Sequence, residues 1–136
     1  MHLIGDADAR IPLEYDPSYT FNDTSAGKRA EYYTTFSDED FFEVAIDDGK
    51  IVGFHAIRII PYPPNFRVGN ISTLWVSEAQ RGLGIAEKLK KLGEDWGRKH
   101  GLLFLQTNVH VKNHRMIEIN EGAGYTTEYL HMRLRL

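Results

Sequence analysis

The chain has 136 residues, of which 42% are hydrophobic and 26% are charged, and its net charge is −3. This length suits a single domain with one core, spanning residues 1–136. Since no apolar run approaches the ~20 residues that a membrane helix needs, the sequence predicts no membrane partner.

The composition also limits the compartment, the metal chemistry and the partners. The chain has no cysteine, which excludes disulfides, thiolate zinc sites and a cysteine nucleophile. The first ten residues contain no basic segment of the kind that begins a secretory signal, so the cytoplasm is the default location. The acidic charge balance argues against nucleic acid as the main partner.

The first 40 residues carry the weakest pattern. Residues 1–4 have the composition of an edge strand, and residues 28–36 have that of a short helix. Proline, asparagine and glycine between these two segments interrupt any regular element. We therefore expect little of the fold to depend on this part of the chain.

The pattern strengthens at residues 41–46, which form the first clear strand. The dipeptide Asp48-Gly49 follows, and it tolerates the positive φ that a two-residue hairpin turn requires. A second strand at residues 51–60 has apolar residues on both faces, which predicts burial on both sides. Prolines should end this strand at Pro61, and residues 69–76 form the next one.

A helix follows, with four apolar residues on one stripe: Ile85, Leu89, Leu92 and Trp96. Gly101 should end this helix. Gly93 and Gly97 weaken it, but their spacing would let it lie close to a sheet.

The last third of the chain repeats the alternation of strand and helix. Residues 102–109 read as a buried strand, and residues 113–121 as a short helix with Asn113 as its N-cap. Residues 125–136 alternate apolar and polar side chains, which predicts a final strand. The order predicts a mixed α/β sheet in which two strands flank a crossover helix.

The most informative segment is the bend that joins the strand at residues 69–76 to the helix, with the sequence Arg81-Gly82-Leu83-Gly84-Ile85-Ala86. A bend of this shape points several backbone N–H groups in one direction, and its glycines let a ligand approach the main chain. The N-terminus of the helix adds its positive dipole end. These features predict a phosphate receptor and therefore a phosphorylated cofactor.

The bend in this context resembles the pyrophosphate loop of the GNAT superfamily of N-acetyltransferases, Arg/Gln-x-x-Gly-x-Gly/Ala. A second signature of that family is an asparagine, a short helix and a closing Gly-Phe/Tyr pair, which Asn113 and Gly124-Tyr125 resemble. The resemblance covers residues 41–136. It implies a mixed, mostly antiparallel central sheet with helices on both faces, the GNAT-like acyl-CoA N-acyltransferase fold.

The resemblance implies acetyl-CoA as the cofactor and an amine, of a small molecule or a protein, as the acceptor. The Val76 N–H would face the thioester carbonyl, and the strand backbone would pair with the pantetheine arm. The implied cofactor-binding residues are Leu74, Trp75, Val76, Arg81, Gly82, Leu83, Gly84, Ile85, Ala86, Asn113 and Asn120.

The catalytic residues are harder to assign. Many family members protonate the leaving sulfur with a tyrosine, and Asn120 stands at the matching position, where an amide cannot act as a general acid. Asn70 and Ser72 are at the usual base positions and would align a water molecule. His55 and His110 are the alternative bases, although a structural or exposed histidine is the plainer interpretation of each. The sequence predicts no metal site.

Three functions remain open at this point. The first is acetyl transfer from acetyl-CoA to a primary amine. The second is a non-catalytic acyl-CoA-binding or regulatory module, which the Asn120 substitution favours. The third is a domain that keeps the fold and acts through protein contacts. A homodimer is expected only by analogy.

Overall fold

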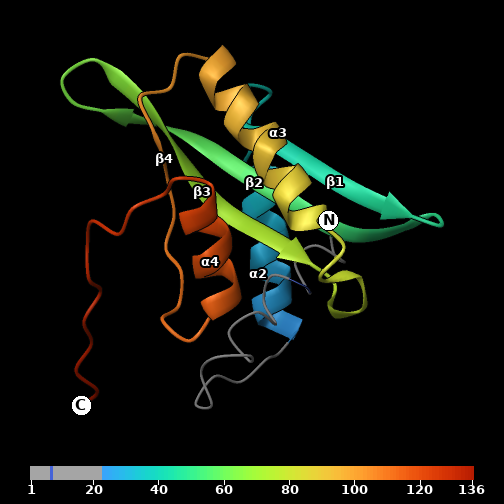
Figure 1. The fold of residues 1–136 in the computed structure, drawn as a ribbon. Coiled ribbons are helices and arrows are strands. Elements are labelled where there is room, and N and C mark those ends of the chain that lie inside the picture. The colour runs from blue at the N-terminus through green and yellow to red at the C-terminus, as the bar shows by residue number, and fades with distance from the viewer. Residues whose placement is uncertain (1–6, 8–22) are drawn as a thin grey trace.

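The fold comes from a computed structural model, which describes residue 7 and residues 23–136. The predicted edge strand at residues 1–4 lies outside the described residues. Figure 1 shows the elements in chain order. They are α2 (Asp23–Thr34), β1 (Phe41–Asp47), β2 (Lys50–Tyr62), β3 (Phe66–Val76), the 3-10 turn η2 (Glu78–Gln80), α3 (Ile85–Lys99), β4 (Leu105–Gln106) and α4 (His114–Gly122).

The strands form one sheet in the order β1-β2-β3-β4. The pairs β1–β2 and β2–β3 are antiparallel, and β3–β4 is parallel. The turn between β1 and β2 has positive φ at Asp48 and Gly49, 48° and 73°, as the Asp-Gly pair predicts. The mixed, mostly antiparallel sheet expected from the sequence is therefore confirmed.

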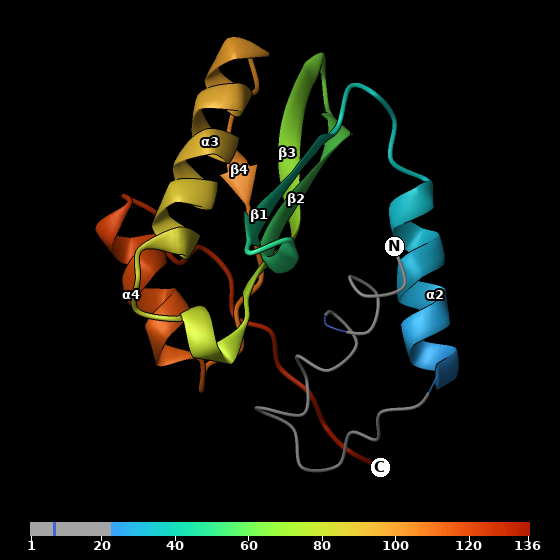
Figure 2. The same ribbon diagram turned by 90° about the vertical axis from the view of Figure 1, so that its right-hand side faces the viewer.

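Helices cover both faces of this sheet, as Figure 2 shows, with α2 on one side and α3 and α4 on the other. Each face has its own apolar cluster. Toward α2 it is built on Tyr33, Phe54 and Ala56. Toward α3 it is built on Phe41, Ile57 and Ile71. The middle of β2, residues 53–57, is buried throughout, which confirms the expectation of burial on both sides.

The helix α3 lies close to the sheet because two of its glycines face it. A Cβ at Gly93 would lie 2.7 Å from both His55 Nε2 and Ile57 Cδ1, and one at Gly97 would lie 3.3 Å from Leu105 Cδ2. The predicted apolar stripe needs one correction, because Leu92 is 50% exposed. Glycine backbone fills part of the interface that the stripe assigned to larger side chains.

β3 begins at Phe66, three residues before its predicted start, and two other strand boundaries also differ from the sequence prediction. First, β2 continues through Pro61, which pairs with Arg67 of β3. Since β1 begins opposite Ile57, this part of β2 has a partner on one side only, the situation in which a strand tolerates proline. Second, the strand predicted at residues 102–109 is reduced to the two residues of β4.

The predicted final strand at residues 125–136 is wrong, because the structure shows this segment without a strand ladder. Its apolar side chains are largely exposed, for example Leu130 at 82% and Leu134 at 83%. A ladder needs a neighbouring edge, and β4 offers only two paired residues. Among the described helices, none is long and apolar enough to cross a membrane.

Candidate functional site

The early end of β4 leaves much of β3 without a neighbour on that side. The ladder between the two strands pairs Gly69 with Leu105 and Asn70 with Gln106, and in the described part of the chain it does not continue toward Val76. Ser77 N–H donates to Val52 of β2. Because successive amides of a strand point to opposite sides, the Val76 N–H points to the open edge. Main-chain groups of β3 thus face a gap in the sheet.

The bend at residues 81–86 follows directly. Gly82 and Gly84 both have φ of 81°, and Gly84 is the N-cap of α3. A Cβ at either glycine would meet nothing within 4 Å, so the positive φ is the reason for glycine here. Among the hydrogen bonds of the described residues, none is donated by the amides of residues 82–86. These N–H groups remain available to a ligand.

Arg81 joins the bend to the end of β3. Its Nε donates to the carbonyl oxygen of Val76 at 3.0 Å. A strand residue directs its N–H and C=O to the same side, so this bond lies at the same open edge as the Val76 amide. The side chain of Arg81 therefore holds the bend against the end of β3, the strand whose open edge would bind a cofactor.

A cavity of about 290 Å³ lies between β3, the bend and α4. Six of the residues predicted to bind cofactor line it together: Leu74, Trp75, Val76, Arg81, Ala86 and Asn113. Five others complete the lining: Lys112, His114, Arg115, Met116 and Ile119. The predicted Gly82, Leu83, Gly84 and Ile85 lie in the adjoining bend and are not part of the cavity wall.

The charge of this cavity suits phosphate. Arg81, Lys112 and Arg115 contribute positive charge, and no carboxylate is among the lining residues. The sequence did not predict Lys112 and Arg115 as part of this site. The only available signal was two basic residues flanking the N-cap Asn113, which also fits an ordinary exposed helix start.

The two asparagines have different surroundings. The Asn113 side chain accepts a hydrogen bond from Met116 N at 3.1 Å, so it caps α4 as predicted. Asn120 is 7% exposed and lies outside the lining of the cavity. Its carbonyl oxygen accepts hydrogen bonds from Ala123 N and Tyr125 N. Its backbone thus ends the helix.

The three candidate catalytic residues are not brought together. His55 is 0% exposed, and its Nδ1 hydrogen-bonds the carbonyl oxygen of Thr73 at 2.9 Å. Burial lowers the pKa of His55 to about 4. A side chain buried in this way fits a structural histidine. It does not fit a general base, which must contact the acceptor.

His110 and Ser72 lie in different places. His110 is exposed after β4, and its Nδ1 accepts from Lys112 N at 3.1 Å. Ser72 is partly exposed on β3, and its hydroxyl hydrogen-bonds the hydroxyl of Tyr32 at 2.8 Å. Neither lines the cavity described above, so a catalytic role for each stays a prediction.

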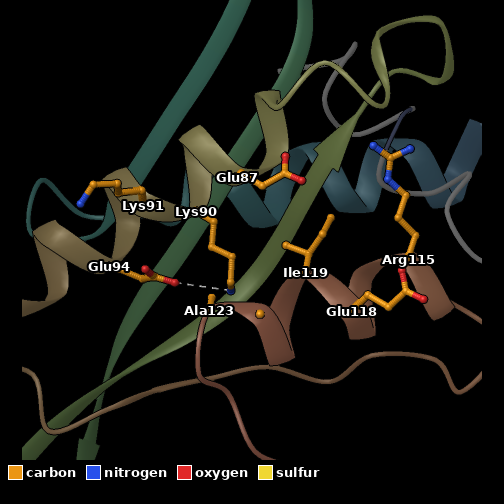
Figure 3. Close-up of a pocket in the computed structure, with 9 residues that line it drawn as sticks. Glu87, Lys90, Lys91, Glu94, Arg115, Glu118, Ile119 and Ala123 are labelled. Carbon is orange, nitrogen blue, oxygen red and sulfur yellow. Dashed lines mark ion pairs between the residues drawn. The ribbon is translucent and has the colours of Figure 1, made fainter.

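A second cavity, of about 510 Å³, lies between α3 and α4 (Figure 3). Its lining mixes three acidic and three basic side chains: Glu87, Glu94, Glu118, Lys90, Lys91 and Arg115. Lys90 is 3% exposed, with Nζ 3.9 Å from Glu94 Oε1 and 3.6 Å from the centre of the Tyr125 ring. Burial lowers the pKa of Lys90 to about 8 and raises that of Tyr125 to about 12.

This second cavity is a poorer phosphate receptor than the first. Its three carboxylates oppose an anion, whereas the first cavity has none. The two cavities meet at α4, since Arg115 and Ile119 line both. Among the described residues, no group of three or more His, Asp or Glu side chains is arranged to hold a metal ion.

Comparison with known families gives a direct assignment. The sequence pattern of the acetyltransferase (GNAT) family matches residues 9–125, which is most of the chain. The chain belongs to the GNAT acetyltransferase family. The bend and Asn113 thus lie in a GNAT chain, and the resemblance noted in the sequence is confirmed.

Relatives of known name share this family. A mycothiol acetyltransferase of Thermomonospora curvata is 28% identical over 79 residues, which is 58% of this chain and 25% of that protein. An aminoglycoside N(6')-acetyltransferase type 1 of Klebsiella aerogenes is 28% identical over 82 residues, 58% of this chain and 54% of that protein. The chain therefore spans about a quarter and about half of the length of these relatives.

Solved structures confirm the fold of this GNAT chain. A protein of Pyrococcus furiosus, provisionally assigned as an acetyl transferase, superposes with a TM-score of 0.79 at 20% identity. The match covers 98% of this chain and 92% of that protein. At this identity the likeness speaks for the fold alone.

Proposed function

We propose that this protein transfers an acetyl group from acetyl-CoA to a primary amine. One observation carries the proposal: the amides of residues 82–86 donate no hydrogen bond among the described residues, and they adjoin a cavity lined by Arg81, Lys112 and Arg115. Free N–H groups at a helix N-terminus bind phosphate. The family membership of the chain supports the same cofactor.

Each part of the site would hold one part of the cofactor. The bend amides and the N-terminus of α3 would bind the pyrophosphate. Lys112 and Arg115 would add positive charge beside it. The open edge of β3 at residues 74–76 would hydrogen-bond the pantetheine arm as an added strand does.

Acetyl-CoA supplies an activated acyl carbon, and the chain would act on it through its backbone. The Val76 N–H would donate to the carbonyl oxygen, where negative charge develops in the transition state. With Asn120 at the family's tyrosine position, the sulfur would leave as a thiolate. A thiol pKa of ~8.5 makes this tolerable near neutral pH.

The acceptor class is a primary amine of a small molecule or a protein. One relative is an aminoglycoside acetyltransferase, so amino sugars belong in any first panel of acceptors. We place the reaction in the cytoplasm and expect neither nucleic acid nor membrane as partner.

A non-catalytic acyl-CoA-binding module is the second candidate. Two side chains favour it, because His55 is too buried to take a proton from an acceptor and the amide of Asn120 cannot protonate the leaving sulfur. The two candidates differ in turnover and agree in cofactor binding.

Release of CoA distinguishes them. The protein is incubated with acetyl-CoA and a panel of amino sugars, aminoglycosides, polyamines and peptides, and free thiol is followed with a thiol reagent. Since the chain has no cysteine, the protein adds no thiol background. Transfer predicts release with at least one amine. If the protein binds acetyl-CoA but releases no CoA with any amine, the non-catalytic acyl-CoA-binding module is the function that remains.

Gly84→Val is the variant that tests the cofactor site. Its φ of 81° is one that a β-branched residue rarely adopts, so the variant should lose CoA binding and release together. Gly101→Val, which meets the same strain at the far end of α3 with φ of 66°, should keep both in the folded protein. Equal CoA affinity in both variants would contradict the proposed cofactor site.

A further inference from the structure

Two consecutive tyrosines of α2 contact two consecutive hydroxyl residues of β3. The Tyr32 hydroxyl bonds Ser72 Oγ at 2.8 Å, and the Tyr33 hydroxyl bonds Thr73 Oγ1. Neighbouring side chains of a regular strand point to opposite faces, so this pairing needs an irregular strand.

A β-bulge provides that irregularity. In the ladder between β2 and β3, Ala56 pairs with Thr73 and Ile57 pairs with Ile71, so Ser72 is the extra residue without a partner. The bulge turns the Ser72 side chain toward α2 beside Thr73. Bulges re-aim side chains in this way next to active sites.

The two hydroxyl pairs differ in access. Tyr33 is 2% exposed and Thr73 is 6% exposed, so no substrate reaches them. Tyr32 and Ser72 are both only partly buried. The outer pair therefore keeps part of its surface exposed, while the inner pair ties α2 to the sheet.

The outer pair is held in place beside the proposed acetyl site. Ser72 precedes Leu74, which lines the first cavity, by two strand positions, about 7 Å. The Arg58 guanidinium lies 5.0 Å from the centre of the Tyr32 ring and hydrogen-bonds Thr35 of the following turn. This cation–π contact fixes the ring while leaving its hydroxyl on Ser72.

We propose that Ser72 and Tyr32 carry the proton away from the acceptor amine, with Ser72 as the catalytic residue and Tyr32 as its positioning residue. The acceptor arrives as an ammonium and gives one proton to Ser72 Oγ. Its nitrogen then bonds to the acyl carbon, the carbon–sulfur bond breaks, and the second proton lost by the nitrogen goes to the leaving thiolate. The Ser72 proton passes to the Tyr32 oxygen, and the Tyr32 proton passes to water. The inference rests on the proposed acetyl transfer.

The test compares Tyr32→Phe with Tyr33→Phe, two neighbours that lose the same hydroxyl. With the best acceptor of the panel, Tyr32→Phe should lower kcat/KM about tenfold or more at neutral pH. The difference in kcat/KM between Tyr32→Phe and the wild type should become smaller above the pKa of the acceptor amine, because the amine then arrives unprotonated. Tyr33→Phe should lower the melting temperature and keep the pH profile of the wild type.

Ser72 variants supply a second, independent arm. Ser72→Ala should lower kcat/KM as Tyr32→Phe does, Ser72→Thr should restore most of it, and the double variant Tyr32→Phe/Ser72→Ala should lose no more than either single one. CoA affinity, measured by calorimetry, should stay the same in all of them. Additive losses, or an unchanged pH profile in Tyr32→Phe, would overturn the relay while leaving acetyl transfer intact.

Absence of CoA release by the wild type with every amine would instead end the proposed function, and the relay with it. A binding probe separates placement from turnover. The probe is CoA whose sulfur carries an N-(2-hydroxyethyl)acetamide group. Its amide N–H lies where the acceptor nitrogen would lie. Wild type should bind it about fivefold more tightly than Ser72→Ala does, and equal affinities would overturn the placement.

Discussion

His55 shows how far a single side chain can be from the role that its chemistry suggests. An imidazole is the usual proton acceptor near neutral pH, yet this one lies beneath α3 with Nε2 against Gly93. Its Nε2 has no hydrogen-bond partner among the described residues. The ring is therefore kept neutral in the folded protein, and its protonation opposes the fold.

The free energy of unfolding should reflect this. The pKa of His55 is about 4 in the folded protein and ~6.5 in the unfolded chain. Between these values the unfolded chain binds the extra proton, so stability is complete above pH ~6.5 and falls as the pH drops toward ~4. The full contribution is about 3 kcal/mol.

Urea unfolding at several pH values checks this effect. His55→Gln, which does not titrate, should show a flatter fall in stability over that pH window, whatever its absolute stability. His131→Gln changes an exposed histidine and should follow the wild type. Parallel curves for wild type and His55→Gln would show that burial does not perturb this histidine.

At the scale of the elements, α3 packs closely on the sheet because Gly93 and Gly97 face the strands. Glycine in a helix is unfavourable by about 1 kcal/mol relative to alanine, so replacing Gly27 of α2, whose Cβ would meet nothing within 4 Å, should stabilise the protein. Gly93→Ala should do the opposite. Its Cβ would overlap two core side chains at 2.7 Å, and overpacking costs about 1–3 kcal/mol.

The two variants form a matched pair in chemical denaturation. Gly27→Ala should raise the midpoint slightly, and Gly93→Ala should lower it clearly. A rise in both would mean that helix propensity, rather than the approach of α3 to the sheet, determines stability at Gly93.

Elements with a local signal were predictable from the sequence, and elements defined by their neighbours were not. The Asp48-Gly49 turn and the Asn113 cap were predicted because each depends on its own backbone and a few adjacent atoms. The end of β2 and the extent of β4 depend on how each strand pairs with β3. The tail alternates like a strand, but alternation does not supply an edge to pair with.

The candidate site follows the same division. The bend at residues 81–86 was readable because its glycines and its helix are contiguous in sequence. The contribution of Arg115 depends on α4 folding back beside β3, and the Tyr32–Ser72 pair joins positions 40 residues apart. Distant pairs of this kind leave no local pattern.

At the scale of the whole molecule, charge is unevenly distributed. The chain carries a net charge of −3, yet the first cavity gathers Arg81, Lys112 and Arg115 without a carboxylate. An anionic cofactor is thus attracted locally and repelled by the average surface. Salt screens both effects, and the shorter-range attraction dominates at contact.

Cofactor affinity should therefore fall with ionic strength. Between roughly 0.01 M and 1 M salt the Debye length falls from about 30 Å to about 3 Å, and CoA binding followed by calorimetry should weaken over this range. Arg115→Gln should flatten the salt dependence. Arg98→Gln, on an exposed arginine paired with Asp95, should leave it unchanged, and the same slope in both variants would exclude Arg115 from the phosphate site.

The edge of β3 that has no neighbour beyond Asn70 affects how the protein behaves when no cofactor is bound. A sheet with an unpaired strand edge can pair with any extended chain that reaches it, including a neighbouring polypeptide in a concentrated solution. Coenzyme bound along that edge would block such pairing as well as take part in the reaction. Without coenzyme, the protein should precipitate at a lower temperature on warming than the same protein at a saturating concentration of coenzyme.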